Sequence, residues 1–421
     1  MSTYQSGTTA TAAITHPITV GSPEFLADPQ AHYAWLRAQA PVYRGRVAYM
    51  GGQDVWMVSR YEDCRTLLTD HRFQRSPAGR DPAMLAQYPD SVRETMRLLT
   101  ASSMIWMDDP GHRRLRGLVA KPFTPKAIAR IGDRVRELAH GLLDELEPVG
   151  RIDLREQFAL PIPSTVISEM VGVPHADREG FGRGVKALVA GMDRIGQDSW
   201  AREMNALTDL VRELIERKRS APGPDILTGL IQAEEQGDQL ADDELVAMVF
   251  LLVAAGYETT YNLITNAVVT LLDHPDQLAR LRAAPGDEAL WRGAVEEIIR
   301  YSSPVGGTEP VTSVEAVTWH DTTIPAGAMV IPLLHAANRD PEVFDAPDRF
   351  DIGRHPNNHL GFGHGVHFCL GANLARLEAR IALGVLFERN PGLRLAVDRS
   401  ELVTEPVPFW FRYHELPVHL R

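Results

Sequence analysis

The sequence predicts a mainly α-helical fold of the α+β type, in which small β-sheets accompany a helix-rich body. Three observations predict it: a long apolar helical stretch at residues 241–273, several shorter helical patterns around it, and strand-like runs that are few and short. The sequence contains no internal repeat and no linker rich in Pro, Gly or Ser. We therefore expect residues 1–20 to form a mobile N-terminal tail and residues 21–421 to form a single domain.

The elements of the first half follow from local patterns. Residues 29–40 have the periodicity of a helix, and residues 46–59 predict two strands that join at Gly51 and Gly52. Prolines and glycines are scattered through residues 74–106, which indicates a long loop. Further helical patterns cover residues 124–146, 164–171, 176–197 and 199–219.

The second half is built around the long stretch at 241–273. Its acidic start, "ADDE", suits a helix N-terminus, and His274 and Pro275 end the pattern. At a rise of about 1.5 Å per residue, this helix would be roughly 50 Å long and would cross the whole molecule. The remaining patterns predict helices at 287–301 and 370–389, strands near 315–320 and 328–333, and an irregular segment at 336–368.

Composition and charge exclude several classes of protein. A net charge of −12 argues against general binding to nucleic acid or to anionic membranes. The longest apolar run, at 245–257, is shorter than the roughly 18 residues of a membrane span, so we expect a buried helix and no membrane insertion. The N-terminus lacks the basic and apolar regions of a signal peptide, and the two cysteines, Cys64 and Cys369, cannot form a disulfide framework. Both features indicate a reducing cytoplasm.

One cysteine stands in the glycine-rich segment "GFGHGVHFCLG" at 361–371. A lone reduced cysteine is usually a small buried apolar residue. Here, however, glycines allow the backbone to approach a ligand closely, and a helix that begins after Cys369 would favour a thiolate, either as a nucleophile or as a metal ligand. A zinc site of His364, His367 and Cys369 is a weak pattern, whereas a single thiolate on a flat, side-chain-poor surface suits haem iron.

The segment 362–371 resembles the haem-binding signature of the cytochrome P450 family, Phe-Gly-x-Gly-x-His-x-Cys-x-Gly, and every fixed position matches. The resemblance extends over nearly the whole chain. It implies a cytochrome P450 fold with haem b between a long distal helix and the proximal helix that follows the cysteine. By this resemblance Cys369 ligates the iron, His367 binds a haem propionate, and Phe362 shields the thiolate. Gly363, Gly365 and Gly371 would form the surface beneath the haem.

The long helix contains the segment "AAGYETTYN". Gly256 costs about 1 kcal/mol relative to alanine in a helix interior, and the Thr259 hydroxyl can bond the carbonyl of Ala255, which would bend the helix and open a groove. Alternatively, the helix packs against a neighbour at its glycine and Glu258 faces solvent. The family carries Ala-Gly-x-Asp/Glu-Thr-Thr over the haem, and residues 255–260 match it. The resemblance implies that Ala255 and Gly256 face the haem, that Glu258 relays protons and that Thr259 holds the oxygen.

A Glu-x-x-Arg motif follows in the next long helix. Glu297 and Arg300 lie three residues apart and hence on one helix face, a spacing that is usually a surface ion pair. In the family this motif forms a buried network with a later arginine, which Arg349 matches best here. By resemblance we assign the three residues to a scaffold for the cysteine loop.

The haem propionates need cationic partners. His112 and Arg116, four residues apart, resemble the propionate-binding pair of the family, and Arg113 and Arg114 would then project outward toward an acidic electron donor. Many bacterial relatives carry another propionate-binding arginine in the strand after the Glu-x-x-Arg helix, but "SSPVGGTEPVTS" has Glu309 and Pro310 there. Either that propionate is held differently, or a water or substrate group fills the gap.

The resemblance implies a haem-thiolate monooxygenase that activates O2 with two electrons from a ferredoxin- or flavodoxin-type donor and its reductase. We expect a cytoplasmic monomer that hydroxylates, epoxidises or oxidatively couples an apolar or amphipathic small molecule of secondary metabolism. The candidate substrate pocket comprises Val253, Val305, Gly306, Thr308, Phe409 and Trp410. The alternatives are a peroxide-driven peroxygenase, which normally lacks an acid–alcohol pair, a haem-binding sensor that consumes no reducing equivalents, and a hydrolase that uses zinc or a cysteine nucleophile.

Overall fold

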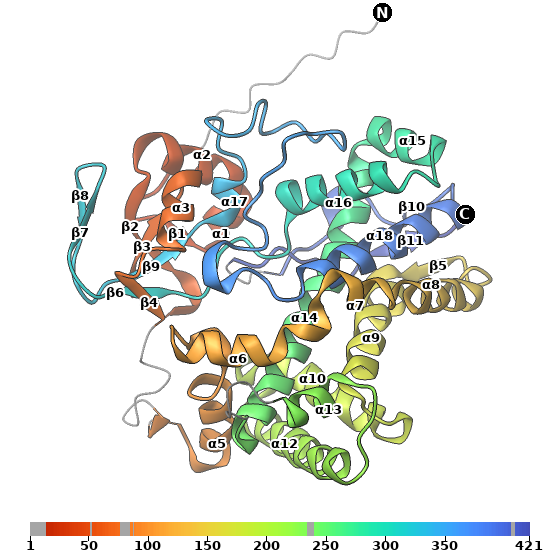
Figure 1. The fold of residues 1–421 in the computed structure, drawn as a ribbon. Helices are drawn as coiled ribbons and strands as arrows, with labels where there is room; N and C mark the ends of the chain where they lie inside the picture. The colour runs from red at the N-terminus through yellow and green to blue at the C-terminus, as the bar shows by residue number, and fades with distance from the viewer. Residues whose placement is uncertain (1–13, 51–52, 76–84, 87, 234–239, 406–408) are drawn as a thin grey trace, which may run out of the picture.

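A six-stranded sheet forms one side of the molecule and helices form the rest (Figure 1). The structure, a computed structural model, describes residues 14–421 except 51–52, 76–84, 87, 234–239 and 406–408. The strand order is β1-β2-β3-β9-β6-β4. The bounds are β1 (Thr19–Val20), β2 (Val42–Val47), β3 (Asp54–Val58), β4 (Phe73–Arg75), β6 (Val311–Ser313) and β9 (Met329–Pro332).

Two smaller sheets and four short helices accompany this sheet. The antiparallel order β10-β11-β5 joins residues near the C-terminus to the middle of the chain, and β7 pairs with β8 as a hairpin. These strands are β5 (Arg151–Asp153), β7 (Val317–Trp319), β8 (Thr322–Ile324), β10 (Arg394–Leu395) and β11 (Pro417–His419). The helices beside the large sheet are α1 (Pro23–Ala27), α2 (Pro29–Gln39), α3 (Tyr61–Leu67) and α17 (Leu334–Ala337).

The N-terminal tail expected at residues 1–20 includes residues that are part of the folded domain. Thr19 and Val20 form β1, which pairs in parallel with β2, and Ile18 and Val20 are buried against the sheet. Two apolar side chains in a short polar segment are enough to anchor it, because strand pairing satisfies the backbone while they enter the core. Most of the remaining tail, residues 1–13, lies outside the described residues.

The helical part packs around α14 (Asp242–Asp273), a 32-residue helix that begins and ends where the sequence predicts. The Glu244 carboxylate accepts the N–H of Ala241 and so closes the first turn. The other helices are α5 (Asp90–Thr100), α6 (Gly111–Val119), α7 (Pro125–Ala129), α8 (Gly132–Leu146), α9 (Pro161–Val171), α10 (Arg178–Ala190), α11 (Met192–Ile195), α12 (Gln197–Ser220), α13 (Ile226–Gln232), α15 (Pro275–Ala283), α16 (Glu288–Ser302) and α18 (Ala372–Arg389).

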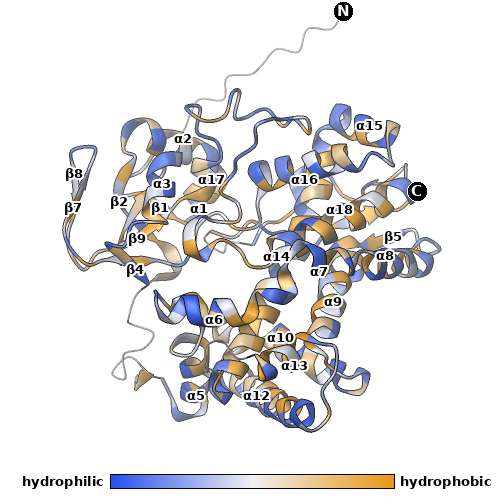
Figure 2. Ribbon diagram, in the orientation of Figure 1, coloured by the Kyte–Doolittle hydropathy of each residue, from blue (hydrophilic) through white to orange (hydrophobic). Residues whose placement is uncertain are grey.

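Helix α14 is the core helix of this part. In the described residues it is the one helix long and apolar enough to cross a membrane, but 72% of its most apolar window is buried inside the protein. It packs against α9, α16 and α18, so the apolar side chains of α14 are buried against these helices. Figure 2 shows blue and orange together on rim helices such as α8, α12 and α15, as expected of helices with one solvent-facing side.

Several predicted elements differ from the structure; the helix predicted at 176–197, for example, is divided between α10 and α11 at Gly191. The predicted loop at 74–106 contains α5, whose buried Val92, Thr95 and Leu98 recur at helical spacing, and Pro89 caps its start. The predicted helix at 124–146 is divided between α7 and α8. Helix α15 was missed, because Pro275 was interpreted as a stop although proline also suits the first turn of a helix.

Candidate active site

An accessible strip runs along the middle of α14, where the rest of the helix is buried. Ala255 is exposed, and Gly256 and Thr259 are partly exposed, whereas Glu258 is buried. The Thr259 hydroxyl donates to the Ala255 carbonyl at 2.5 Å, the bond that the sequence suggested, while α14 continues as a helix through this segment. A Cβ atom at Gly256 would meet only the side chain of Ile167, at 3.7 Å. Packing within the protein therefore does not require this glycine, and Glu258 does not face solvent.

Buried Glu258 belongs to a chain of ion pairs. Its carboxylate pairs with Arg412, whose Nε lies 2.5 Å from a Glu405 oxygen, and that carboxylate also pairs with Arg194 at 2.6 Å. Burial and the charges of Arg194 and Arg155 lower the pKa of Arg412 to about 10. Sequence reasoning missed these arginines, because neither stands in a motif or near Glu258 in the chain.

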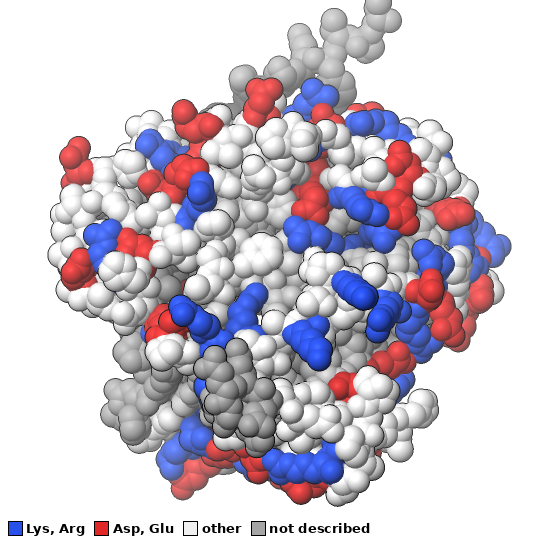
Figure 3. Space-filling model, viewed as in Figure 1, with Lys and Arg blue, Asp and Glu red and all other residues white. Residues whose placement is uncertain are grey.

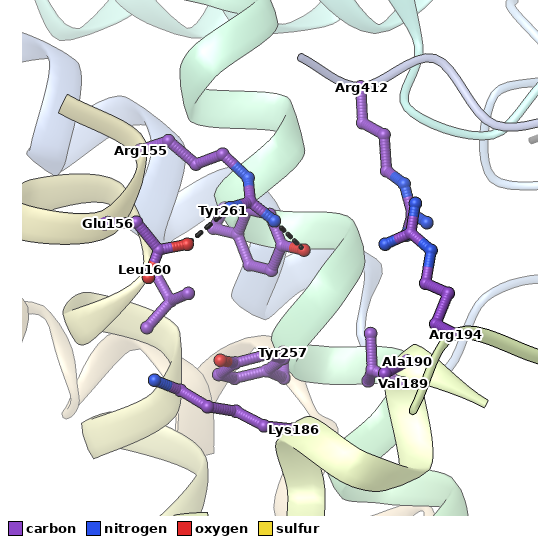
Figure 4. A pocket seen from close by; sticks show the side chains of 10 residues that line it. All are labelled: Arg155, Glu156, Leu160, Lys186, Val189, Ala190, Arg194, Tyr257, Tyr261 and Arg412. Carbon is purple, nitrogen blue, oxygen red and sulfur yellow. Dashed lines mark hydrogen bonds and ion pairs between the residues drawn. The ribbon is translucent and has the colours of Figure 1, made fainter. Parts of the chain in front are cut away.

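A cavity of about 190 Å³ lies on the other side of α14. Figure 4 shows Arg412 and Arg194 on one side of it and Tyr257 and Lys186 below, and Tyr257 is about 200° around the helix from Ala255. Arg155 crosses the cavity to donate to Tyr261 at 3.3 Å. This polar cavity is thus separate from the accessible strip, although Arg412 lines it and also pairs with Glu258.

The cysteine loop is held by its backbone. The Cys369 N–H donates to the Phe362 carbonyl at 2.9 Å, and Gly365 has φ +72°, where a Cβ atom would lie 2.6 Å from the Leu68 carbonyl oxygen. Gly363 has the same φ, and a Cβ at Gly371 would meet no described protein atom within 4 Å. The loop is therefore packed against Leu68 at Gly365, while the space beside Gly371 is open in the described structure.

The protein surroundings of Cys369 favour the neutral thiol over the thiolate. Burial raises its pKa, although the N–H of Gly371 and the guanidinium groups of Arg116 and Arg376 oppose this. A coordinated metal would deprotonate it outright. Cys64, in contrast, is fully buried and donates to the Val58 carbonyl, as expected of a structural cysteine.

Phe362, at the start of the cysteine loop, packs against an arginine that a carboxylate holds in place. The guanidinium of Arg376 lies 4.4 Å from the centre of the Phe362 ring and donates to both oxygens of Glu296, at 2.6 and 2.8 Å. Burial would raise the pKa of Glu296, but the hydrogen bonds from His359 and Arg376 outweigh burial and hold this pKa at about 2. The position of Phe362 is thus fixed by a charged pair behind it.

The predicted propionate ligands come together at one corner. The rings of His112 and His367 lie 4.1 Å apart, and Arg116 donates to the Phe368 carbonyl at 2.7 Å. A buried Nε2 atom on each of the two histidines has no hydrogen-bond partner. Burial, Arg75 and His112 lower the pKa of His367 to about 3, and burial and Arg116 lower that of His112. Two neutral histidines with vacant nitrogens beside arginines fit the carboxylates of haem.

The Glu-x-x-Arg pair is buried, as the resemblance implied, but its third member is a different residue. Glu297 and Arg300 form two hydrogen bonds of 2.8 Å, and both side chains have no exposed surface. The assignment of Arg349 is wrong: its side chain is 69% exposed and faces Asp351, while Arg354 donates to both Glu297 oxygens at 3.1 Å. Arg349 contributes only its carbonyl oxygen, which accepts from Arg300 and Arg354.

Two loops bring most of the predicted pocket residues together. The Gly306 N–H donates to the Phe409 carbonyl at 2.7 Å, and Val305 and Trp410 form an isolated β-bridge. A Cβ atom at Gly306 would overlap the ring of His335, so glycine is required there. Thr308 follows in the same loop and donates to the carbonyl of Glu309 at 3.0 Å.

Val253 does not belong to this pocket. It is 2% exposed and packs in the main core. At 100° per residue it lies about 160° around α14 from Ala255, so the two side chains leave the helix on nearly opposite sides. Leu251 and Ala254, which are partly exposed, are better placed to border the accessible strip.

The zinc alternative has no support in the structure. Across the described parts of the chain, no three His, Cys, Asp or Glu side chains gather as a metal site. His364, His367 and Cys369 therefore do not converge on one point, which disfavours a zinc-dependent hydrolase.

Comparison with known proteins agrees with this geometry. A family model described as "Cytochrome P450" matches residues 185–287 and 288–390. Cytochrome P450 monooxygenase PikC of Streptomyces venezuelae is 42% identical over 99% of this chain and 97% of its own length, and the vitamin D(3) 25-hydroxylase of Pseudonocardia autotrophica is 41% identical over 94% of each chain. The structure of P450BioI in complex with an acyl carrier protein ligated to hexadec-9Z-enoic acid superimposes with a TM-score of 0.84 at 36% identity, covering 94% of this chain and 99% of that one.

Sequence identity above 40% over nearly the whole chain, together with the matching fold, establishes the family. The protein belongs to the bacterial cytochrome P450 family, has the cytochrome P450 fold, and is a haem-thiolate monooxygenase.

Proposed function

We propose that the protein inserts one atom of O2 into an apolar or amphipathic small molecule, by hydroxylation, epoxidation or oxidative coupling in secondary metabolism. For hydroxylation the balance is one substrate, one O2, two electrons and two protons, which give the hydroxylated product and one water. Electrons come singly from a ferredoxin- or flavodoxin-type donor and its reductase. The observation that carries the proposal is the acid–alcohol pair on α14, in which Thr259 lies on the accessible strip and the neighbouring Glu258 is buried beside it.

The cofactor is haem b, with Cys369 as the iron ligand and His112, Arg116 and His367 as propionate ligands. The orphaned Nε2 atoms of the two histidines support this assignment, because each buried nitrogen needs a partner. When bound, the haem supplies the redox centre for O2 reduction and substrate oxidation, and the thiolate donates electron density to it. Gly363, Gly365 and Gly371 of the cysteine loop, and Ala255 and Gly256 of α14, would face the haem when it is bound.

Glu258 and Thr259 supply and hold protons. Glu258 pairs with Arg412, which has a second carboxylate partner in Glu405. Arg412 can therefore turn fully to Glu405. Glu258 is then free to carry a proton, and Arg412 does not become an unpaired buried charge. The Thr259 hydroxyl, which now donates to Ala255, can rotate to place its proton in the groove. This arrangement disfavours the peroxygenase alternative, which needs no relay.

The substrate is apolar over much of its surface. The candidate pocket walls are Val305, Gly306, Thr308, Phe409 and Trp410, joined by the partly exposed Leu251 and Ala254 of α14. The relatives support this chemistry by their names: one is a hydroxylase of vitamin D(3), and P450BioI was crystallised with a fatty-acyl carrier protein. A cytoplasmic enzyme of secondary metabolism agrees with these relatives.

The electron donor is an acidic protein that docks near α6. Figure 3 shows Lys and Arg side chains across the middle of the face that carries α6 and α7. Arg113 has 81% of its side chain exposed, and Lys121 and Lys126 are exposed. Arg114, expected to project outward with Arg113, instead pairs with Glu244 at the start of α14, because that carboxylate lies within its reach. Arg113, which also pairs with Asp109, and the two lysines thus carry the docking charge.

The test is the absorption spectrum of the reduced, CO-treated protein. A strongly red-shifted Soret band is expected in the wild type and in Cys64→Ser, the matched control, but not in Cys369→Ser. A colourless wild type, or a band that survives Cys369→Ser, would overturn the haem assignment. Turnover of apolar compounds with ferredoxin, reductase and O2 is expected to exceed turnover with hydrogen peroxide; the reverse would make it a peroxygenase. Failure of every compound to accelerate electron use would make it a sensor.

A further inference from the structure

Arg75, at the end of β4, is a buried cation that the assigned site does not use. It is 7% exposed, and its guanidinium donates to the Glu309 carbonyl oxygen at 2.9 Å. It makes no ion pair with any carboxylate in the part of the chain that the structure describes. A buried charge without a counter-ion is costly, so the site is built for an anion that the polypeptide does not provide.

The position of Arg75 in the sheet explains why it is there. β4 pairs with β6 in antiparallel orientation, and Arg75 lies opposite Val311. The two residues before Val311 are Glu309 and Pro310, at the place where the family resemblance leads one to expect an arginine, and no Lys or Arg occurs between Arg300 and Arg339. The neighbouring strand thus supplies a guanidinium where β6 has none.

Two acidic residues, Asp108 and Glu309, lie near enough to act on the charge of Arg75, but neither carboxylate forms an ion pair with its guanidinium. The Asp108 carboxylate accepts the main-chain N–H of Arg75, at 3.0 and 3.2 Å, rather than its guanidinium. The Glu309 carbonyl oxygen accepts from the Arg75 guanidinium, whereas burial raises the pKa of the Glu309 carboxyl and the charge of Arg75 opposes this rise. The positive charge of Arg75 therefore remains available.

The same corner contains two further unused polar atoms. His112 and His367 are in ring contact, each with a buried Nε2 that lacks a partner, and Arg75 is near enough for its charge to act on His367. A planar anionic group with two oxygen atoms would satisfy a guanidinium and an imidazole N–H together, and guanidinium–carboxylate geometry is well matched for this.

We propose that Arg75 binds a propionate carboxylate of the haem, in place of the arginine that β6 lacks. The inference rests on the proposed function, because the carboxylate comes from the haem. It answers how the propionate beside Glu309 is held: by a residue from the adjacent strand.

The test compares haem loss from the holoenzyme to excess apomyoglobin in wild type, Arg75→Gln and Arg75→Lys. The matched control is Arg72→Gln, which lies in the turn before β4 and pairs with Asp70 instead. Because a hydrogen bond to a charged group is lost, Arg75→Gln should release haem on the order of tenfold to a hundredfold faster, with Arg75→Lys between it and wild type. The reduction potential of Arg75→Gln should also shift to a more negative value. Arg72→Gln should match wild type in both the rate of haem loss and the reduction potential.

Haem dimethyl ester, whose propionates carry no charge, separates carboxylate binding from a structural role. Reconstituted with this ester, wild type and Arg75→Gln should release it at the same rate. The proposal is overturned if Arg75→Gln behaves like Arg72→Gln, or if its full effect persists with the ester. It is also overturned if Glu309→Gln abolishes the difference, since Arg75 would then serve Glu309. If Arg75→Gln does not accumulate, the same cycle is run with Arg75→Lys.

Failure of the haem assignment gives a different result. In that case wild type itself would bind no haem, and the CO spectrum would be absent from every variant; a haem-binding sensor or peroxygenase would instead keep the spectrum and be identified by the turnover measurements described above. Haem binding by wild type with no effect of Arg75 would instead overturn this inference and leave the proposed function intact.

Discussion

Two glutamates are buried in neighbouring helices of the same core, and their surroundings differ. Glu297 on α16 accepts from Arg300, Arg354 and Asn357, and from the N–H of Asp351, so both of its oxygens are fully used. Within the described ranges, Glu258 on α14 has one ion-pair partner, Arg412, which it shares with Glu405. A carboxylate with every oxygen occupied can only hold structure in place. One with a single, shared partner can change partner and therefore carry a proton.

The largest effect should come from Glu297→Ala. The substitution leaves Arg300 and Arg354 buried without their carboxylate, and breaking a buried pair from one side costs about 3–5 kcal/mol. Thermal or denaturant unfolding should show this loss, with loss of the haem spectrum at moderate temperature. Glu288→Ala on the same helix, which removes a largely exposed carboxylate, should cost less than about 1 kcal/mol. Equal losses for both variants would contradict the scaffold role of Glu297.

The next effect should be on catalysis rather than on folding. Glu258→Gln keeps the shape of the side chain but cannot carry the proton, so turnover should fall by about a hundredfold or more, with an altered solvent deuterium isotope effect. Asp273→Asn, at the other end of α14, breaks an exposed ion pair with Arg399 and serves as the control. If Glu258→Gln turned over like Asp273→Asn, the relay role would be wrong.

A third buried glutamate, Glu378, extends the comparison to a carboxyl with a buried oxygen that has no hydrogen-bond partner among the residues that the structure describes. Glu378 on α18 is 1% exposed, and burial raises its pKa to about 8. The folded protein thus keeps a proton that the unfolded chain releases above about pH 4.5, so stability should fall as pH rises from about 4.5 to about 8 and then level off.

Glu378→Gln should remove this dependence. Between pH 6 and pH 7 the wild type should lose up to about 1.4 kcal/mol more than the variant. Thermal unfolding of both holoproteins over that range measures the difference. Parallel pH curves would show that Glu378 is ionised in the folded protein.

The smallest effect should come from Thr259→Ala. The hydroxyl holds and orients oxygen rather than supplying the proton, so total electron use should change less than about tenfold, while more electrons should end in hydrogen peroxide and fewer in product. Peroxide yield per electron is the measurement. Thr265→Ala, which removes another α14 hydroxyl bonded to a backbone carbonyl, is the control. Unchanged coupling in Thr259→Ala would remove that hydroxyl from the oxygen site.

Local features of the site could be predicted from the sequence. The bond from Thr259 to Ala255 and the pair of Glu297 with Arg300 each span one helical turn, so spacing alone defines them. The bounds of α14 also followed from its apolar pattern and its capping residues. These predictions succeeded because the partners are fixed to one another by a single element.

Contacts between distant segments could not be predicted. Arg349 and Arg354 flank the same turn, and nothing in the sequence indicates which side chain points inward. Arg75 and Arg412 reach the site from the sheet and from the C-terminal segment, so their roles depend on tertiary packing. Val253 was misplaced because a continuous stretch of a helix was treated as one face, although successive residues turn by 100°.

The two pocket loops are joined by main-chain atoms: Gly306 to Phe409, and Phe411 to Pro304. Such bonds make no demand on the side chains of Val305, Thr308 or Trp410, which can vary while the loops stay in place. New substrate preferences can therefore arise by mutation at these positions without loss of the oxygen chemistry on α14. A mutant library confined to these three positions should therefore contain many folded members.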